Sequence, residues 1–225
     1  MAVPGLGLSV RCWEPALAAL SPHVRGTAVA LPAFGAPAVP RTVLGPASSA
    51  GRLVARLDAL GLDRVVLLGH SASCQVVAET AARHPDRVAA LVLVGPTTDP
   101  LARSWPALVR RWWRSTLRER GLPLPRLLRD YTYSGMVSFV RALHASRRHR
   151  LDRVLTTVTC PVLVLRGTHD HIAPAGWIRR LADATGHGAA ASLTAGAHMV
   201  PLTHPHELAD ELRGFLSPQL LRNAG

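Results

Sequence analysis

Residues 64–84 are RVVLLGHSASCQVVAETAARH, and this stretch decides the fold. Arg64–Leu68 is almost continuously apolar and predicts a buried β-strand. Residues 72–84 predict a helix, which ends before Pro85 because proline cannot continue it. Ser71 stands on the tight turn between them, where a strained backbone would force its side chain outward. The stretch therefore predicts a serine nucleophile at the carboxyl end of a buried strand.

The turn needs small residues on both sides of Ser71, because it brings the strand and helix backbones together. Gly69 meets this need before the serine, whereas Ser73 stands where a second glycine would be expected. The pattern is therefore G-x-S-x-S. A simpler alternative is that Ser71 only caps the helix, since serine is favoured at that position.

Outward from this stretch, short aliphatic runs alternate with helical patterns. This alternation predicts an α/β fold with a mostly parallel sheet flanked by helices. The expected strands are 27–31, 64–68, 87–94, 161–165 and 190–193, and the expected helices are 48–60, 72–84, 175–185 and 204–216. Residues 97–156 interrupt the alternation with prolines, three tryptophans and helical pieces.

Two partners for Ser71 follow it in the chain. Asp170 comes just after the strand 161–165, and His198 follows the last short strand. Serine, acid and histidine in this order fit a hydrolytic triad on a strand–turn–helix scaffold. Asp99, which follows the strand 87–94, is the alternative acid. Asp170 as a turn residue and His198 as a surface histidine are the non-catalytic alternatives.

Further motifs make the chain resemble the α/β-hydrolase family, in particular its smaller serine hydrolases with a helical lid. The resemblance covers nearly the whole chain. Its motifs are VPGLG at 3–7, LPAFG at 31–35, HPDRV at 84–88 and HP at 204–205. Pro4 stands where many members have histidine.

The resemblance implies roles for these residues. Ser71 would attack an acyl carbonyl, His198 would move its proton and Asp170 would orient the histidine. The backbone amides of Leu6 and Ala72 would hold the oxyanion. We therefore expect a serine hydrolase that cleaves a carboxylic ester or a related acyl bond of a small molecule, with no cofactor and no metal. An acyltransferase, a C–C bond hydrolase and a non-catalytic ligand-binding member of the fold are the alternatives.

The resemblance also implies a domain organisation. Residues 1–225 would form one domain, with residues 97–156 as its lid. In the family, the strand before the oxyanion loop is third of eight and central, yet only four residues precede Gly5 here. The chain would thus lack the first two strands and half of the next. We expect in-frame codons for them upstream of Met1.

Composition limits the other possibilities. All 26 basic residues are arginines, and 14 acidic residues leave a net charge of +12. Residues 103–153 hold thirteen arginines and three acids and so carry +10 of it. Three interpretations stay open for this segment. The first is a solvated helix face whose apolar residues pack inward, namely Val109, Trp112, Leu117, Leu127 and Leu128. The second is a surface that attracts either anionic acyl substrates or the acidic surface of a partner. The third, and least favoured, is a nucleic-acid site.

Localisation follows from what the sequence does not contain. No apolar stretch approaches the roughly 20 residues of a membrane-spanning helix. Three scattered cysteines form no disulfide framework or zinc motif, and no signal peptide is visible. We expect a cytoplasmic protein; the oligomeric state is not indicated.

Overall fold

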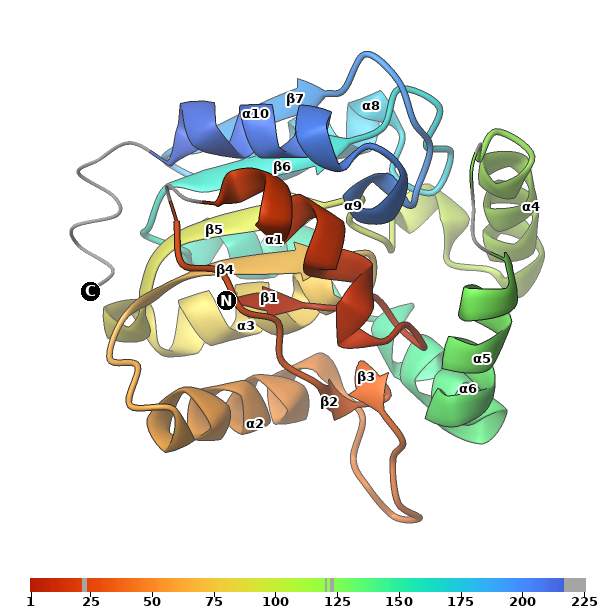
Figure 1. Cartoon of the computed structure of the whole chain (residues 1–225), viewed down its shortest axis with the longest axis horizontal. Helices are drawn as coiled ribbons and strands as arrows, with labels where there is room; N and C mark the ends of the chain where they lie inside the picture. Colours follow the sequence, from red (N-terminus) through yellow and green to blue (C-terminus); the bar gives the residue numbers. More distant parts are fainter. Residues whose placement is uncertain (22–23, 120, 122–123, 217–225) are drawn as a thin grey trace.

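A parallel five-stranded sheet forms the centre of the molecule (Figure 1). The computed structural model describes residues 1–21, 24–119, 121 and 124–216. The strand order is β1-β4-β5-β6-β7, and β2 and β3 form a separate small sheet. The strands are β1 (Ala2–Val3), β2 (Leu31–Pro32), β3 (Gly35–Ala36), β4 (Val65–His70), β5 (Val88–Val94), β6 (Val162–Arg166) and β7 (Gly188–Ser192).

Every residue of β4, β5 and β6 is buried. Apart from His70 and Arg166 at their carboxyl ends, these strands are apolar, because helices cover both faces of the sheet. The predicted α/β fold class is therefore confirmed.

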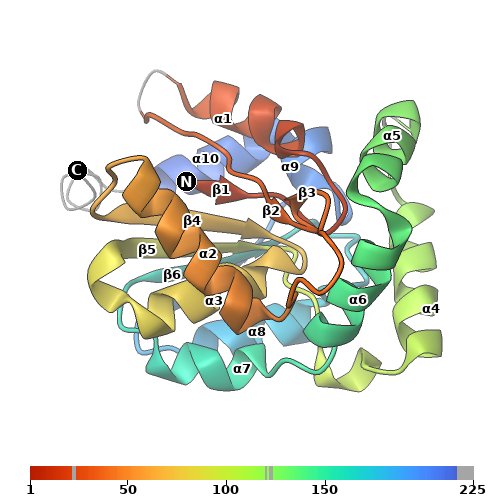
Figure 2. The same ribbon diagram turned by 90° about the horizontal axis from the view of Figure 1, so that it is seen from below.

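Two helical layers enclose the sheet (Figure 2). One face carries α1, α9 and α10, and the other carries α2, α3, α7 and α8. The helices are α1 (Glu14–Leu20), α2 (Pro46–Ala59), α3 (Ser73–Arg83), α4 (Trp105–Thr116), α5 (Leu124–Ser134), α6 (Met136–Ser146), α7 (Leu151–Val154), α8 (Ala175–Asp183), α9 (Val200–Thr203) and α10 (Pro205–Phe215).

Residues 97–156, between β5 and β6, form the helical segment. Its helices α4, α5 and α6 lie together on one side of the molecule, beyond the carboxyl ends of the sheet strands, in both views. In open parallel sheets, this is the edge at which ligands bind. Arg120, one of its arginines, lies outside the described residues.

Inward packing of the apolar residues in the helical segment is mostly a wrong prediction. Leu127 is buried, but Val109, Trp112, Leu117 and Leu128 are exposed. On α4 the inward side carries Ser115, the only residue of that helix that is buried. Polar contacts of Arg111 and Ser115 join α4 to the rest of the molecule.

Two element predictions also need correction. Residues 27–30 form no regular strand, and Leu31 belongs to the short β2. Ala28 makes one isolated bridge to Ala2, because the short β1 offers little backbone to pair with. Helix α2 begins at Pro46, with Gly45 as its N-cap, instead of at Ser48 or Ser49. Proline at the first helical position explains the earlier start, since its fixed φ suits a helix and its missing N–H would be unpaired there anyway.

Within the residues described, none of the helices is both long and apolar enough to cross a lipid bilayer.

Candidate active site

Ser71 occupies a strained turn between β4 and α3. Its φ is 59°, a left-handed conformation that residues with a Cβ rarely adopt. Its amide donates to the carbonyl of Val94 at 2.9 Å, which fixes the turn against β5. A Cβ on Gly69 would lie 2.8 Å from the Cα of Cys74, so only glycine fits there. The strained turn places the Ser71 hydroxyl at the carboxyl edge of the sheet.

Ser73, the departure from glycine, is accommodated by its hydrogen bonds. Its buried hydroxyl lies 2.9 Å from the carbonyl oxygens of Val3 and His70 and accepts the His70 amide at 2.8 Å. The hydroxyl thereby links the turn to β1, and the extra Cβ causes no break between strand and helix.

The structure brings Ser71, His198 and Asp170 into one hydrogen-bonded chain. The Nε2 atom of His198 lies 2.8 Å from the Oγ of Ser71, and its Nδ1 atom lies 2.9 Å from the Oδ2 of Asp170. The three residues come from loops after β4, β7 and β6, which are far apart in sequence. If Nδ1–H donates to the carboxylate, Nε2 is left as an acceptor for the serine proton.

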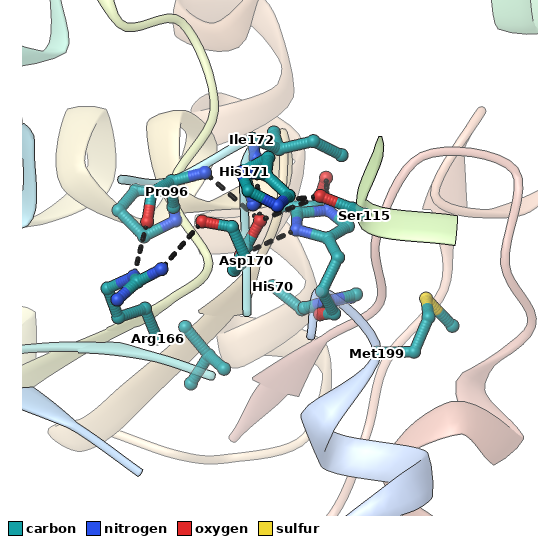
Figure 3. A network of polar contacts seen from close by, with 12 residues as sticks. His70, Pro96, Ser115, Arg166, Asp170, His171, Ile172 and Met199 are labelled. Carbon is teal, nitrogen blue, oxygen red and sulfur yellow. Dashed lines mark hydrogen bonds and ion pairs between the residues drawn. The ribbon is translucent and has the colours of Figure 1, made fainter. Parts of the chain in front are cut away.

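Asp170 is fully buried, and its loop is built to hold an ionised carboxylate. Its Oδ1 accepts the amides of Ile172 at 2.8 Å and Ala173 at 3.1 Å (Figure 3). Burial opposes ionisation, but the nearby His198 and these hydrogen bonds hold the pKa of Asp170 below its usual value. The group therefore remains a carboxylate next to the histidine.

Arg166 shapes this loop from below. Its guanidinium donates to the carbonyls of Thr168, Asp170 and Ala173 at 2.7–2.9 Å. The sequence offered a signal for this role, because Arg166 is the one charged residue at the end of the apolar strand β6.

His198 is also buried. Burial alone would lower its pKa, but the charge and hydrogen bond of Asp170 raise it above the ordinary value. The carboxylate of Glu119 contributes to the increase. Asp170 and His198 thus favour each other's charged forms.

Helix α4 and the residues just after it touch the loops of both groups. Ser115 Oγ accepts the amide of His171 at 2.9 Å and lies 3.5 Å from Asp170 Oδ1 (Figure 3). One helical turn later, Glu119 Oε1 accepts the amide of Met199 at 2.7 Å. Sequence analysis missed both residues, because a lone serine or glutamate in a helical segment carries no recognisable pattern.

His70, directly before Ser71, supports the histidine loop. Its Nε2 atom lies 2.9 Å from the carbonyl oxygen of His198, and the two rings pack 5.1 Å apart. Burial and the neighbouring His198 lower its pKa to about 3. His70 is therefore a neutral donor, which positions the His198 backbone.

Asp99, the alternative acid, is engaged elsewhere. Its carboxylate lies 2.6 Å from a guanidinium nitrogen of Arg111 and accepts the amide of Leu101. This ion pair fastens α4 to the end of β5. Asp170, and not Asp99, contacts His198.

Leu6 lies in the loop after β1, and Ala72 directly follows Ser71. Neither of their amides donates a hydrogen bond within the part of the chain that is described. The loop around Leu6 is held by α5: the hydroxyl of Ser134 donates to the carbonyl of Gly7 at 3.1 Å, and a Cβ on Gly7 would overlap the ring of Tyr131. Both amides are thus without a hydrogen-bond acceptor among the residues that the structure describes.

The other chemistry-bearing residues are less suited to a site. Among the residues that the structure describes, no group of three or more His, Cys, Asp or Glu side chains could hold a metal ion. The three cysteines are buried, and burial raises the pKa of Cys12 to about 12 and that of Cys160 to about 11. A thiol with such a pKa is a poor nucleophile near neutral pH.

Comparisons with known proteins find similar hydrolases. The relatives include the "Putative carbamate hydrolase RutD" of Caulobacter sp. (strain K31), which is 26% identical over 95% of this chain and 88% of its own length. The enol-lactonase from Burkholderia xenovorans LB400 superimposes with a TM-score of 0.76 at 20% identity, covering 96% of this chain and 89% of its own. A thermophilic esterase from Thermogutta terrifontis gives a TM-score of 0.76 at 19% identity, covering 98% and 89%.

The family match extends across most of the fold. The model of the "Alpha/beta hydrolase family" matches residues 2–211, which include the strained turn and the loops of Asp170 and His198. The chain belongs to the alpha/beta hydrolase family.

Proposed function

We propose that this protein is a serine hydrolase that cleaves an ester or a related acyl bond through an acyl-enzyme on Ser71. The observation that carries the proposal is the hydrogen-bonded chain from Asp170 through His198 to Ser71, at 2.9 and 2.8 Å. In such a chain the histidine can remove the serine proton while the carboxylate stabilises the imidazolium that forms.

The reaction would proceed in two halves. Ser71 Oγ attacks the acyl carbonyl as its proton moves to Nε2 of His198, and the imidazolium then protonates the leaving group. A water molecule, activated by the same histidine, releases the acyl group from Ser71. Asp170 remains ionised throughout, in agreement with its lowered pKa.

The amides of Leu6 and Ala72 are the proposed oxyanion donors. Both are free of other acceptors among the described residues, and Ala72 lies one residue after the nucleophile. A preorganised donor of this kind is typically worth about 3 kcal/mol in the transition state. The helical segment 97–156 is the proposed lid, because Ser115 and Glu119 contact the loops of Asp170 and His198, and Ser134 of α5 contacts the loop of Leu6.

The relatives support acyl chemistry without specifying one substrate. Their printed names cover a carbamate hydrolase, an enol-lactonase and an esterase, and all three reactions begin with attack on an acyl carbonyl. A panel of activated esters, lactones and carbamates is therefore the appropriate substrate screen.

Labelling by a fluorophosphonate probe tests the proposal, because only an activated serine reacts. The wild-type protein should be labelled, and Ser71→Ala should abolish both labelling and ester turnover. Ser73→Ala is the matched control, because it removes a neighbouring hydroxyl and should keep labelling. If Ser73→Ala lost labelling and Ser71→Ala kept it, Ser71 would not be the nucleophile.

A wild-type protein that is folded and not labelled would contradict the proposal and support a non-catalytic ligand-binding role. If the acyl group is found on an added alcohol or amine instead of being released by water, the reaction is acyl transfer and not hydrolysis.

A further inference from the structure

The outward side of α4 is unusually apolar for a surface helix. Trp105, Val109, Trp112, Trp113 and Leu117 are all exposed, with Trp112 at 50% and Trp113 at 57% of their full accessibility. Their spacing of three, four and seven residues places them on one side of the helix. We call these five residues the outer face of α4. Isolated exposed apolar residues are common, but a contiguous row of this size indicates a binding surface.

Arginines border this face. Arg110, Arg114 and Arg118 are exposed and recur every four residues, so they form a row beside the apolar one. The three acids of residues 103–153 do not pair with these arginines in the described structure, because they contact other groups. Glu119 binds the Met199 amide, Asp130 binds Ser9, and Asp152 pairs with Arg150 and Arg180.

The neighbouring helices continue the same character. Leu128 on α5 and Val137 and Val140 on α6 are exposed apolar residues, and Arg129 and Arg141 are exposed beside them. The three helices lie on the same side of the molecule in both views (Figures 1 and 2). The exposed residues on these three helices are therefore of the same kinds, namely apolar, aromatic and positively charged.

This combination selects among possible partners. A second copy of the chain would place like-charged arginine rows together and would be repelled. A nucleic acid would use the arginines but would leave Val109 and Leu117 without a role. An anionic lipid surface uses both, because tryptophan and aliphatic side chains enter the headgroup region while arginines pair with phosphates.

We propose that the outer face of α4 and its arginine row bind the surface of an anionic lipid bilayer, with the helix lying in the interface plane. The interaction is peripheral and does not depend on catalysis, so it stands or fails separately from the proposed hydrolase activity.

Co-sedimentation with vesicles tests this directly. Full-length protein should bind vesicles of phosphatidylglycerol and phosphatidylcholine, and far more weakly vesicles of phosphatidylcholine alone. Added salt should weaken binding, because the arginine contribution is screened. Tryptophan emission should shift to the blue on binding, since Trp105, Trp112 and Trp113 are exposed whereas Trp13 and Trp177 are already buried.

Two variants separate the contributions. Arg110→Gln with Arg114→Gln should weaken binding by about five-fold for each charge removed. Trp112→Ser with Trp113→Ser should weaken it by more than about ten-fold and remove most of the emission shift. Arg56→Gln on α2 with Leu60→Ser at its C-cap is the matched control, because both residues are exposed, Leu60 at 50%, and α2 lies away from α4 (Figure 1). This control should bind as the wild type does.

Three results would overturn the proposal. The first is no binding to anionic vesicles at low salt. The second is binding to duplex DNA that is lost in the arginine variant and kept in the tryptophan variant, which would make the surface a polyanion site. The third is a concentration-dependent dimer that only the tryptophan variant abolishes. Ser71→Ala should bind vesicles normally, which keeps this test distinct from that of the active site.

Discussion

Strand β5 and helix α4 are both rich in apolar residues, yet they have opposite environments. Every residue of β5 is buried, whereas Ser115 is the only buried residue of α4. The strand lies between two helical layers, so apolarity on both of its sides is required for burial. The helix makes polar contacts with the fold through Arg111 and Ser115, and most of its large apolar residues are exposed. Apolar composition thus predicts burial in a central strand but does not identify the inward face of an inserted helix.

The largest expected effect is on catalysis and comes from Asp170, in the loop after β6. Asp170→Asn should lower kcat by about 10⁴-fold, because an amide favours the wrong tautomer of His198. The thermal midpoint should change little by comparison. Steady-state kinetics on an activated ester measures the loss, with Asp99→Asn as the control. A greater loss from Asp99→Asn would assign the catalytic acid to the end of β5.

The next effect compares the two environments directly. Leu91→Ala in β5 should destabilise the fold by about 3 kcal/mol, because it leaves a cavity in a close-packed interior. Leu128→Ala on α5, 66% exposed, should change the free energy of unfolding by less than about 0.5 kcal/mol. Urea denaturation of both variants provides the measurement. Equal losses would mean that the helical segment packs as the core does.

A third effect concerns pH and the buried His70. The folded protein keeps this ring neutral down to a pKa of about 3, whereas an unfolded histidine takes up a proton near pH 6.5. The unfolded state therefore binds more protons between these values, and stability should fall as pH decreases from about 6.5 towards about 3. At pH 5 the free energy of unfolding should be about 2 kcal/mol lower than near neutral pH because of His70.

His70→Gln keeps a donor for the His198 carbonyl and should remove this part of the acid dependence. Unfolding free energies measured between pH 4.5 and 7.5 provide the test, with the exposed His144→Gln as control. An unchanged slope in His70→Gln would contradict the neutral assignment.

The smallest effect tests the inner side of α4 and the residue after it. Glu119→Gln keeps the acceptor for the Met199 amide and removes the charge that helps to raise the pKa of His198. The acidic limb of the kcat/KM profile should therefore move to lower pH. Ser115→Ala leaves that charge in place and should not move the limb. A profile that is identical in wild type and Glu119→Gln would limit Glu119 to a structural contact.

The strained turn and the order of its partners were predictable because they are local or topological features. Gly69 and Ser71 follow an apolar run, and loops after parallel strands meet at one edge of the sheet. The contacts of Ser115 and Glu119 were not predictable, because they depend on where the helical segment lies in three dimensions. Arg166 carried a signal as the one charged residue of β6, but its acceptors in the following loop, Thr168, Asp170 and Ala173, depend on how that loop folds. The start of α2 was missed for a local reason: two serines suggested a cap, but Pro46 had already begun the helix.

Helix α4 and the turn that follows it face the catalytic loops on one side and the surroundings on the other. Ser115 and Glu119 contact the loops of Asp170 and His198, while Trp112 and Trp113 point away from the fold. A lipid surface that displaces α4 would therefore change the affinity of the site for its substrate. By thermodynamic linkage, substrate binding would change the affinity for the lipid surface as well. A substrate whose affinity rises by some factor on the surface must increase the affinity for that surface by the same factor.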